Sequence, residues 1–285
     1  MLKLKAYAKI NLSLKILGKR TDGYHALDSI MQSISLFDLI SLETIPEGIQ
    51  LTTSNLPAGR QGAQLPTDNR NLAYKAAQAM FKTINARRKT SGGVKIDLQK
   101  NIPLAAGLAG GSADAAAVIF GLNLMSGNIL QAEELLAVGA QVGSDVPFCL
   151  QGGNCRVRGR GEMVERTEDQ GVSRYFVLVV PEVEVSTRWA YEAWDEESLK
   201  FKVQKLKILN DLEPIVIEKY PVIQKIKDRL LEAGCLSAQM SGSGSSVFGE
   251  ISSAQLGEKI VSSLKKEYPN SYFVSTVGRG VEEIV

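Results

Sequence analysis

The sequence contains a single histidine, His25, among its 285 residues. A zinc site built from several histidines is therefore excluded, and a Ser–His–Asp triad would have to use this one residue. Cysteine is also scarce, because only Cys149, Cys155 and Cys235 are present and none of them belongs to a CxxC pair. An odd, sparse set of this kind is typical of reduced thiols in a cytoplasmic protein.

Long apolar runs and an excess of charge of one sign are also missing. No run reaches the ~18 apolar residues that a membrane-spanning helix needs, so we expect no membrane partner. The N-terminal segment alternates apolar and charged residues and lacks the apolar core of a signal peptide. The 33 basic and 31 acidic residues give a net charge of +2, which offers no global argument for binding nucleic acid.

What the sequence does contain is a mixture of strand and helix patterns. Residues 2–16 alternate apolar and polar side chains, which predicts a strand whose polar face carries Lys9 and Asn11 one pleat repeat apart. The later patterns show no regular βαβ repeat, so they favour an α+β fold over a doubly wound sheet. They predict strands at 29–43, 49–54, 92–102, 175–185 and 271–279, a hairpin at 152–165, and helices near 71–88, 113–125, 132–143, 195–207, 210–219, 221–233 and 253–267.

Two polar stretches indicate how the chain is divided. Residues 55–70 are rich in glycine, proline and polar side chains, which predicts an exposed loop. The stretch RTEDQGVSR is polar and contains glycine, so we expect a domain boundary near 165–172.

The stretch IPLAAGLAGGSADAAAVIF, residues 102–120, resembles neither of the two commonest nucleotide motifs. No lysine follows its glycines, as a Walker-type loop requires, and the glycines at 107, 110 and 111 have the wrong spacing for a dinucleotide fingerprint. It does predict a strand, a small-residue loop and then a helix capped by Ser112, with Asp114 in the first turn. Such a helix end can bind an anion, but a tight helix joint without a ligand explains these residues equally well.

A second Gly/Ser-rich stretch, MSGSGSSVFG, follows a predicted helix that ends near Gly234. Alone it predicts no more than a turn. Two such loops in one chain favour a ligand that both of them face.

Together these segments resemble the GHMP kinases, small-molecule kinases named for galactose, homoserine, mevalonate and phosphomevalonate. PLAAGLAGGSADAAA is similar to their phosphate loop and AQMSGSGSSVFG to their third motif. AYAKINLSLKILGKRTDGYHALDSIMQSISLFD and VGSDVPFCLQGG resemble, more specifically, the branch that phosphorylates CDP-methylerythritol in non-mevalonate isoprenoid biosynthesis. The resemblance runs along the whole chain and implies a ribosomal-protein-S5-like domain at 1–168 and a ferredoxin-like α+β domain at 169–285.

The reaction that this resemblance implies is transfer of the γ-phosphoryl group of ATP to the 2-hydroxyl group of CDP-methylerythritol. By the family pattern, Asp145 accepts the hydroxyl proton, and Lys9 holds Asp145 and the developing charge in a hydrogen-bonded pair. Without the family, the favoured interpretations are a turn residue for Asp145 and a solvated strand lysine for Lys9. We further expect a monomer or weak homodimer.

The resemblance also assigns the substrate side of the site. Tyr24 is expected to stack on cytosine and His25 to bond to its edge, while Tyr191, or else Trp189, supplies the second ring. Half-buried surface tyrosines and a core histidine are the ordinary alternatives. The remaining residues expected to face the substrate are Asn11, Gly242, Ser243 and Gly244.

On the nucleotide side, the resemblance implies that ATP and Mg²⁺ bind along the first glycine-rich loop. Asn71 and Lys100 match positions that contact the adenosine end, and Ser112 is the one side chain expected to reach the metal. The full set of expected ATP-binding residues is Asn71, Lys100, Pro103, Leu104, Ala105, Ala106, Gly107, Leu108, Ala109, Gly110, Gly111 and Ser112.

The chain departs from the family pattern at Ala109, where glycine is usual, and at Ala113, where serine is frequent. Because alanine at positive φ costs about 1 kcal/mol or more, we expect a negative φ at Ala109. Asp114 is expected to serve the helix dipole or cap rather than a metal. Arg156, Arg158 and Arg160 follow one strand face, which favours a solvated face over a nucleic-acid contact.

Two other functions remain as alternatives. One is a GHMP kinase for a sugar, homoserine or mevalonate, against which DGYH and the stacking tyrosine argue. The other is a non-catalytic RNA-binding module on the same fold, which would show salt-dependent RNA affinity and no ATP hydrolysis.

Overall fold

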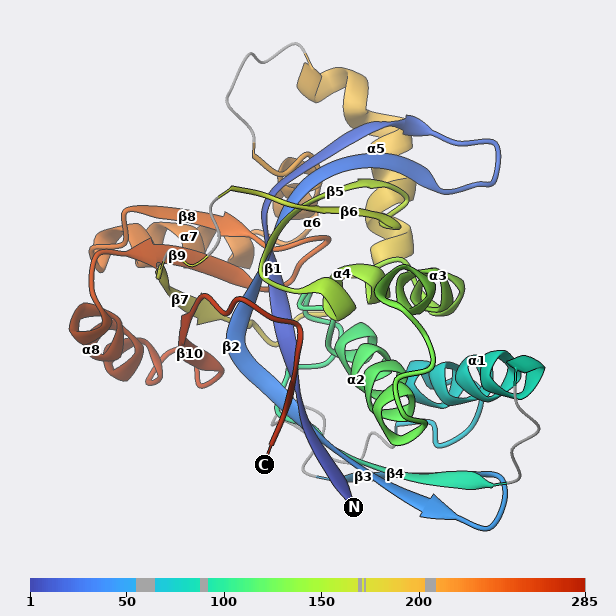
Figure 1. The fold of residues 1–285 in the computed structure, drawn as a ribbon. Coiled ribbons are helices and arrows are strands. Elements are labelled where there is room, and N and C mark those ends of the chain that lie inside the picture. Colours follow the sequence, from blue (N-terminus) through green and yellow to red (C-terminus); the bar gives the residue numbers. More distant parts are fainter. Residues whose placement is uncertain (55–64, 88–91, 169–170, 172, 203–208, 285) are drawn as a thin grey trace.

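A computed structural model describes residues 1–54, 65–87, 92–168, 171, 173–202 and 209–284, so most of the predicted loop at 55–70 lies outside the described residues. Within these ranges the chain forms two sheets with helices packed on them (Figure 1), which confirms the predicted α+β fold. The elements in chain order are β1 (Leu2–Lys19), β2 (His25–Ile45), β3 (Ile49–Ser54), α1 (Leu72–Arg87), β4 (Gly93–Gln99), α2 (Gly110–Met125), α3 (Ala132–Val142), α4 (Val146–Gln151), β5 (Asn154–Gly159), β6 (Met163–Arg166), β7 (Tyr175–Val179), α5 (Thr187–Lys202), α6 (Glu213–Lys219), α7 (Val222–Glu232), β8 (Ser237–Met240), β9 (Val247–Ile251), α8 (Ala254–Leu264), β10 (Ser271–Ser275) and β11 (Val281–Glu283).

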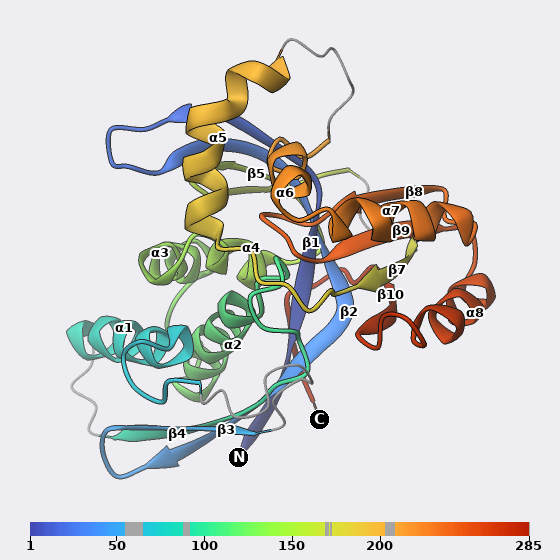
Figure 2. The same cartoon turned by 180° about the vertical axis from the view of Figure 1, so that it is seen from behind.

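The first sheet is built around the long antiparallel pair β1 and β2, and its strand order is β11-β1-β2-β4-β3. Strand β2 pairs with β4 and, along another part of its length, with β5, which in turn pairs with β6. Helices α1 to α4 lie together beside this sheet (Figures 1 and 2), with α2 and α4 in contact with β1. The apolar face of β1, including Leu4, Ala6 and Ile10, is buried in their common core, as the period of two predicts.

The second sheet is antiparallel and has the order β10-β7-β9-β8. Helices α7 and α8 pack on its strands, and α5 and α6 join the same apolar core. The chain then returns to the first sheet, where β11 pairs with β1 through Leu4 and Glu283. The division of the chain at 168 and 169 stays a prediction.

Strand β1 is less regular than its sequence pattern. Its pairing with β2 shifts register between Tyr7 and Lys9 and between Asn11 and Ser13. Its polar face is also covered, because Lys9 and Asn11 are only 4 % and 1 % exposed. A solvated face for Lys9, the ordinary alternative, is therefore wrong: loops from both halves of the chain lie over it.

Most predicted elements are found, but several bounds differ. Helix α5 begins at Thr187 rather than near 195, because Ser186 accepts a hydrogen bond from the backbone N–H of Trp189 and starts the helix earlier. The Gly/Ser-rich stretch 240–249, for which no more than a turn was predicted, joins β8 to β9, and the short α4 and β11 were not predicted either. Alternating small and apolar residues carry too weak a strand signal beside glycine and serine.

Candidate active site

A cavity of about 1010 Å³ is lined by residues of β1 and β2, of helix α5 and of several loops. The predicted site residues that line it are Lys9, Asn11, Tyr24, His25, Pro103, Ala105, Ala106, Gly107, Leu108, Ala109, Gly110, Gly111, Ser112, Asp145, Tyr191, Gly242, Ser243 and Gly244. Three predicted residues, Asn71, Lys100 and Leu104, do not line it. The fold thus gathers segments from both ends of the chain around one space.

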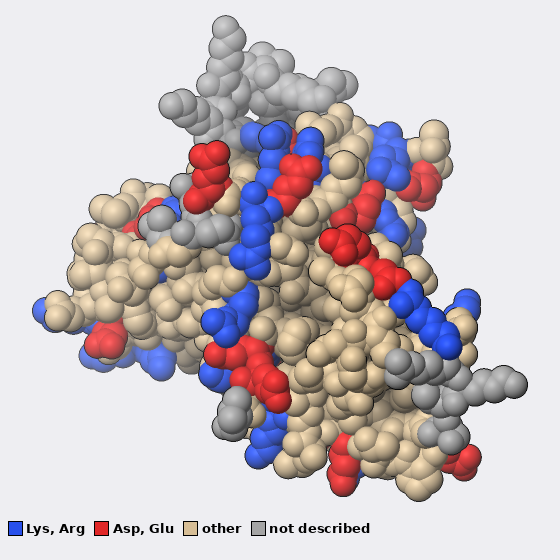
Figure 3. Space-filling view, in the orientation of Figure 1, with Lys and Arg blue, Asp and Glu red and all other residues tan. Residues whose placement is uncertain are grey.

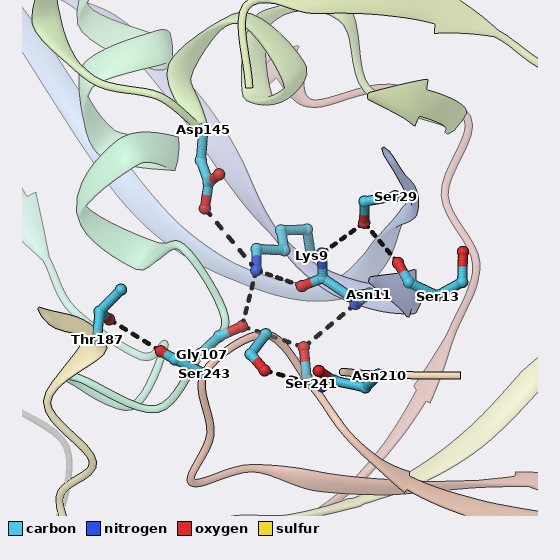
Figure 4. Close-up of polar contacts among 11 residues, drawn as sticks. Lys9, Asn11, Ser13, Ser29, Gly107, Asp145, Thr187, Asn210, Ser241 and Ser243 are labelled. Atoms are coloured by element: carbon cyan, nitrogen blue, oxygen red, sulfur yellow. Dashed lines mark hydrogen bonds and ion pairs between the residues drawn. The ribbon is translucent and has the colours of Figure 1, made fainter. Parts of the chain in front are cut away.

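Lys9 lies at the centre of the polar contacts in this cavity (Figure 4). Its Nζ donates to Oδ1 of Asn11 at 2.6 Å and to the carbonyl of Gly107 at 3.0 Å. It also lies 3.8 Å from Oδ2 of Asp145, which is the distance of an ion pair rather than of the predicted hydrogen bond. The predicted neighbourhood of Lys9 and Asn11 is confirmed, and two neutral acceptors fix the ammonium group beside the carboxylate.

The backbone fixes the position of Asp145, and its carboxylate makes no capping hydrogen bond. It immediately precedes α4 and occupies its N-cap position, but its side chain caps no backbone N–H. The side chain is 31 % exposed and lines the cavity. Its carboxylate is therefore available to a ligand on one side and to Lys9 on the other.

Asn11 connects Lys9 to the third motif. Its side-chain amide donates to Oγ of Ser29 at 2.9 Å, which leaves Oδ1 to accept from Lys9. Its backbone N–H donates to Oγ of Ser241, and that hydroxyl donates to the same Gly107 carbonyl that Lys9 binds. Strand β1, the first glycine-rich loop and the third motif therefore share one buried hydrogen-bond network.

The conformation of the first glycine-rich loop corrects two predictions. Ala109 has φ 57° and ψ 29°, so the expected negative φ is wrong; Ala105 also has a positive φ, of 49°. Helix α2 begins at Gly110, so Ser112 lies inside its first turn and is not the cap. Lys9 fixes this path, because its backbone N–H donates to Leu108 and its Nζ to Gly107.

The N-terminus of α2 has no side-chain cap. The first N–H groups of a helix have no partner within it, and Ala109 has no side chain that could cap them. Gly110, Gly111 and Ser112 all line the cavity, so these donors and the positive end of the helix dipole face it. The structure favours a phosphate loop over a ligand-free helix joint.

The third motif packs directly on this loop. A Cβ at Gly107, where φ is 75°, would lie 2.4 Å from the carbonyl oxygen of Ser241, so only glycine fits. The amide of Asn210 donates to the carbonyls of Met240 and Gly242, and Thr187 shares a hydrogen bond with Ser243. Asn210 and Thr187 were missed, because a lone polar residue carries no sequence signal of a long-range contact.

At the other end of the cavity, aromatic residues gather around His25. The Tyr191 ring stacks on it at a centroid distance of 4.9 Å, and Tyr24 is 50 % exposed with the Arg160 guanidinium over its ring. Burial, with a smaller effect of the Asp145 carboxylate, raises the pKa of Tyr191, which keeps its phenol neutral. Trp189 packs on Tyr220 and does not line the cavity, which favours Tyr191 as the second ring.

Lys100 and Asn71 lie elsewhere. Lys100 is 1 % exposed and its ammonium contacts both Asp38 and Asp114. Asp114 is therefore a buried ion-pair partner, and not the dipole or capping residue that the sequence predicted. Asn71 caps α1, accepting from the N–H of Ala73 and donating to the carbonyl of Pro66.

The three arginines of the predicted strand face have different surroundings. Arg156 pairs with Asp28 and Arg158 with Glu165. On the face in Figure 3, basic side chains lie beside acidic ones. Arg160 differs from both, because it lines the cavity, which its place in a run of arginines did not predict.

Metal and membrane sites were also sought among the described residues. They include no group of three or more His, Cys, Asp or Glu side chains placed to hold a metal ion. No helix among them is long and apolar enough to cross a membrane. The three cysteines are free and buried.

Comparison with known proteins identifies both halves of the chain. Residues 71–153 match the family model of the GHMP kinases N terminal domain, and residues 202–270 match that of the GHMP kinases C terminal domain. The chain is 41 % identical to a 4-diphosphocytidyl-2-C-methyl-D-erythritol kinase of Caldanaerobacter subterraneus subsp. tengcongensis, with 99 % of each chain covered. It is 42 % identical to the kinase of that name from Caldicellulosiruptor saccharolyticus, with 86 % of this chain and 87 % of the relative covered.

Solved structures agree with these relatives. A crystal structure of 4-(cytidine 5'-diphospho)-2C-methyl-D-erythritol kinase matches with a TM-score of 0.78 and 28 % identity over 97 % of this chain and 99 % of that one. A homoserine kinase from Cytophaga hutchinsonii matches with a TM-score of 0.73 at 22 % identity, covering 99 % of this chain and 97 % of that one. The second match supports the fold alone.

Proposed function

The chain belongs to the 4-diphosphocytidyl-2-C-methyl-D-erythritol kinases of the GHMP kinase family, and we propose that it transfers the γ-phosphoryl group of ATP to the 2-hydroxyl group of that cytidylyl substrate. The observation that carries this proposal is the position of Lys9 and Asp145. Nζ of Lys9 lies 3.8 Å from Oδ2 of Asp145, in a cavity that the N-terminus of α2 and the aromatic residues around His25 also line.

Asp145 and Lys9 have separate tasks in this reaction. Asp145 accepts the proton of the attacking hydroxyl group, because its carboxylate faces the cavity and caps no helix. Lys9 lies beside it and stabilises the negative charge on the transferred group. Phosphoryl transfer needs position and charge neutralisation more than covalent chemistry, so the two neutral acceptors that fix Lys9 contribute directly.

The phosphates of ATP bind to the N–H groups at the start of α2, between Leu108 and Ser112. Mg²⁺ fits this site as an ion held by phosphate oxygens and water, because that ion keeps several waters and needs few protein ligands. Ser112 is the side chain that would reach it, since Asp114 is buried with Lys100. When bound, the ion neutralises phosphate charge. Asn71 and Lys100 do not line the cavity, and their contact with the adenosine end stays a prediction.

The base of the substrate binds between Tyr24 and Tyr191, with His25 at its edge. Stacking on an aromatic ring contributes about 1–3 kcal/mol per base, so this end of the cavity supplies much of the affinity. Homoserine, mevalonate and sugars have no group to occupy it. An RNA-binding function is disfavoured because Arg156 and Arg158 are paired with carboxylates.

The test is ADP release from Mg-ATP with a panel of acceptors. We expect release with the cytidylyl substrate and not with homoserine, mevalonate or galactose. No acceptor-dependent release would exclude every kinase function, and RNA binding that weakens steeply with salt would then favour the alternative module.

Asp145→Asn tests the assignment within the site. The variant should fold and bind CDP normally but lose turnover by roughly 10²–10⁴-fold, the usual contribution of a general base. Glu133→Gln, an exposed carboxylate on α3, is the matched control and should change neither. Near-normal turnover of Asp145→Asn would remove Asp145 from the mechanism.

The cytoplasmic location and the monomeric or weakly homodimeric state of the protein stay predictions.

A further inference from the structure

Three side chains on one face of α5 surround His25. Tyr191, Trp194 and Asp195 are spaced i, i+3 and i+4, so they project from the same side of the helix. Tyr191 stacks on the imidazole, Trp194 meets its plane edge-on at 5.8 Å, and Oδ1 of Asp195 lies 2.7 Å from Nε2. His25 itself comes from the start of β2, and its side chain is only 8 % exposed.

The Asp195 contact determines which ring nitrogen carries the hydrogen. An ionised carboxylate only accepts hydrogen bonds, so Nε2 must donate to it. In the neutral imidazole, Nδ1 is then an acceptor with a free lone pair. No protein group within the described ranges bonds to Nδ1, and His25 lines the cavity.

Lys19 shares the same carboxylate, with its Nζ 2.6 Å from Oδ2 of Asp195. Burial alone would raise the pKa of Asp195, but the hydrogen bonds from His25 and Lys19 lower it overall, so the carboxylate is ionised. Lys19 therefore offsets part of the negative charge that faces the imidazole.

We propose that Asp195 is a positioning residue that holds His25 with Nε2 protonated, so that Nδ1 accepts a hydrogen bond from an exocyclic amino group and selects cytosine over uracil. Cytosine presents an amino group where uracil presents a carbonyl oxygen, which would face the Nδ1 lone pair unfavourably. This inference rests on the proposed function, because it assumes that the base reaches His25. It adds Asp195 to the residues that select the base, although the Asp195 side chain need not contact the base itself.

The first test compares the binding of CDP and UDP by calorimetry. Asp195→Asn keeps the size of the side chain, but its amide can either donate or accept, so both tautomers become accessible. We expect the preference for CDP over UDP to fall about tenfold, the equivalent of one hydrogen bond, with little change in kcat at saturating substrate. Glu196→Gln, the next residue on α5 and outside the cavity lining, should leave the preference unchanged.

The second test reads the tautomer directly. His25 is the only histidine in the sequence, so ¹⁵N-histidine labelling gives one pair of imidazole nitrogen signals that need no assignment between residues. We expect the neutral ring of the parent protein to show a protonated Nε2 and a bare Nδ1, and Asp195→Asn to show a mixture. A parent ring protonated at Nδ1 would overturn the inference.

The two proposals fail in distinguishable ways. An Asp195→Asn variant that keeps full CDP preference, in a protein that does phosphorylate the cytidylyl substrate, overturns the role of Asp195 alone. If the parent protein phosphorylates no cytidylyl acceptor and does not bind CDP, both proposals are wrong.

Discussion

Lys9 is a charged side chain held almost out of contact with water by Asn11 and Gly107. A buried lysine is costly unless its hydrogens are satisfied, and here both partners lie on the walls of the cavity. The alternation of β1 predicted that Lys9 and Asn11 would be neighbours, because strand periodicity is local. It could not predict their burial, which depends on loops far along the chain.

Lys9→Met should reduce kcat by roughly 10²–10³-fold, the usual effect of removing one donor that stabilises transition-state charge. It should also lower stability by about 1–3 kcal/mol, because the Asn11 and Gly107 acceptors lose their partner. Steady-state kinetics and urea unfolding measure the two effects. Lys15→Met is the control, since Lys15 lies on the same strand but its side chain is 46 % exposed. Equal losses in both variants would contradict the assignment.

Gly107 combines a positive φ with close packing, and two substitutions separate these effects. Gly127→Ala meets nothing within 4 Å at φ 81°, so it should cost only the backbone strain of about 1 kcal/mol. Gly107→Ala, at φ 75°, would also drive Cβ into Ser241 and should cost about 2 kcal/mol more. Urea unfolding gives both values. Similar losses would mean that the loop can move away from the third motif.

Among the elements, the junction of β4 and α2 rests on a buried charge cluster that the sequence did not predict. Asp38 on β2 accepts from the backbone N–H groups of Asn101 and Ile102, and Lys100 lies between Asp38 and Asp114. Lys100 therefore holds the start of the first glycine-rich loop against β2 and α2. Pairing between a lysine and two distant carboxylates leaves no periodic pattern in the sequence, so the cluster could not be predicted.

Asp114 should make stability depend on pH. Burial, with the nearby Asp38 carboxylate, raises the pKa of Asp114, and its Oδ1 has no hydrogen-bond partner. Between the unfolded value near 4 and this raised pKa, the folded state holds a proton that the unfolded state has lost, so stability falls as the pH rises through that window. Asp114→Asn should flatten the fall, measured as unfolding free energy against pH. An unchanged slope would place the effect elsewhere.

The helix ends show which features of the fold local sequence patterns can predict. Leu72–Arg87 and Val222–Glu232 match their predicted helices closely, because apolar periodicity and flanking breakers define both. The predicted start of helix α5 was too far along the sequence. For that reason the sequence did not indicate that Asp195 faces the site. The motif residues were found through family resemblance, whereas Asn210, Ser241 and Asp195 act through contacts that only the folded chain creates.

At the scale of the whole molecule, the proposed base pocket joins the two halves, since Tyr24 lies in the turn after β1, His25 begins β2 and Tyr191 lies on α5. CDP should therefore slow amide exchange in segments 20–27 and 187–195 together, because one base contacts both. Hydrogen exchange by mass spectrometry measures this. ADP is the control ligand and should protect 105–113 instead. Protection of only one of the two segments by CDP would contradict a shared pocket.

The pairing of β11 with β1 has a consequence for synthesis on the ribosome. Strand β1, which carries Lys9, is made first, but its partner at the sheet edge is made after all the other strands. Until residues 281–283 leave the exit tunnel, that edge of β1 presents unpaired backbone groups, the feature through which nascent chains associate wrongly. Among the described strands, pairing of β11 with β1 is therefore the last pairing that synthesis allows, and the edge of the strand that carries Lys9 is exposed until then.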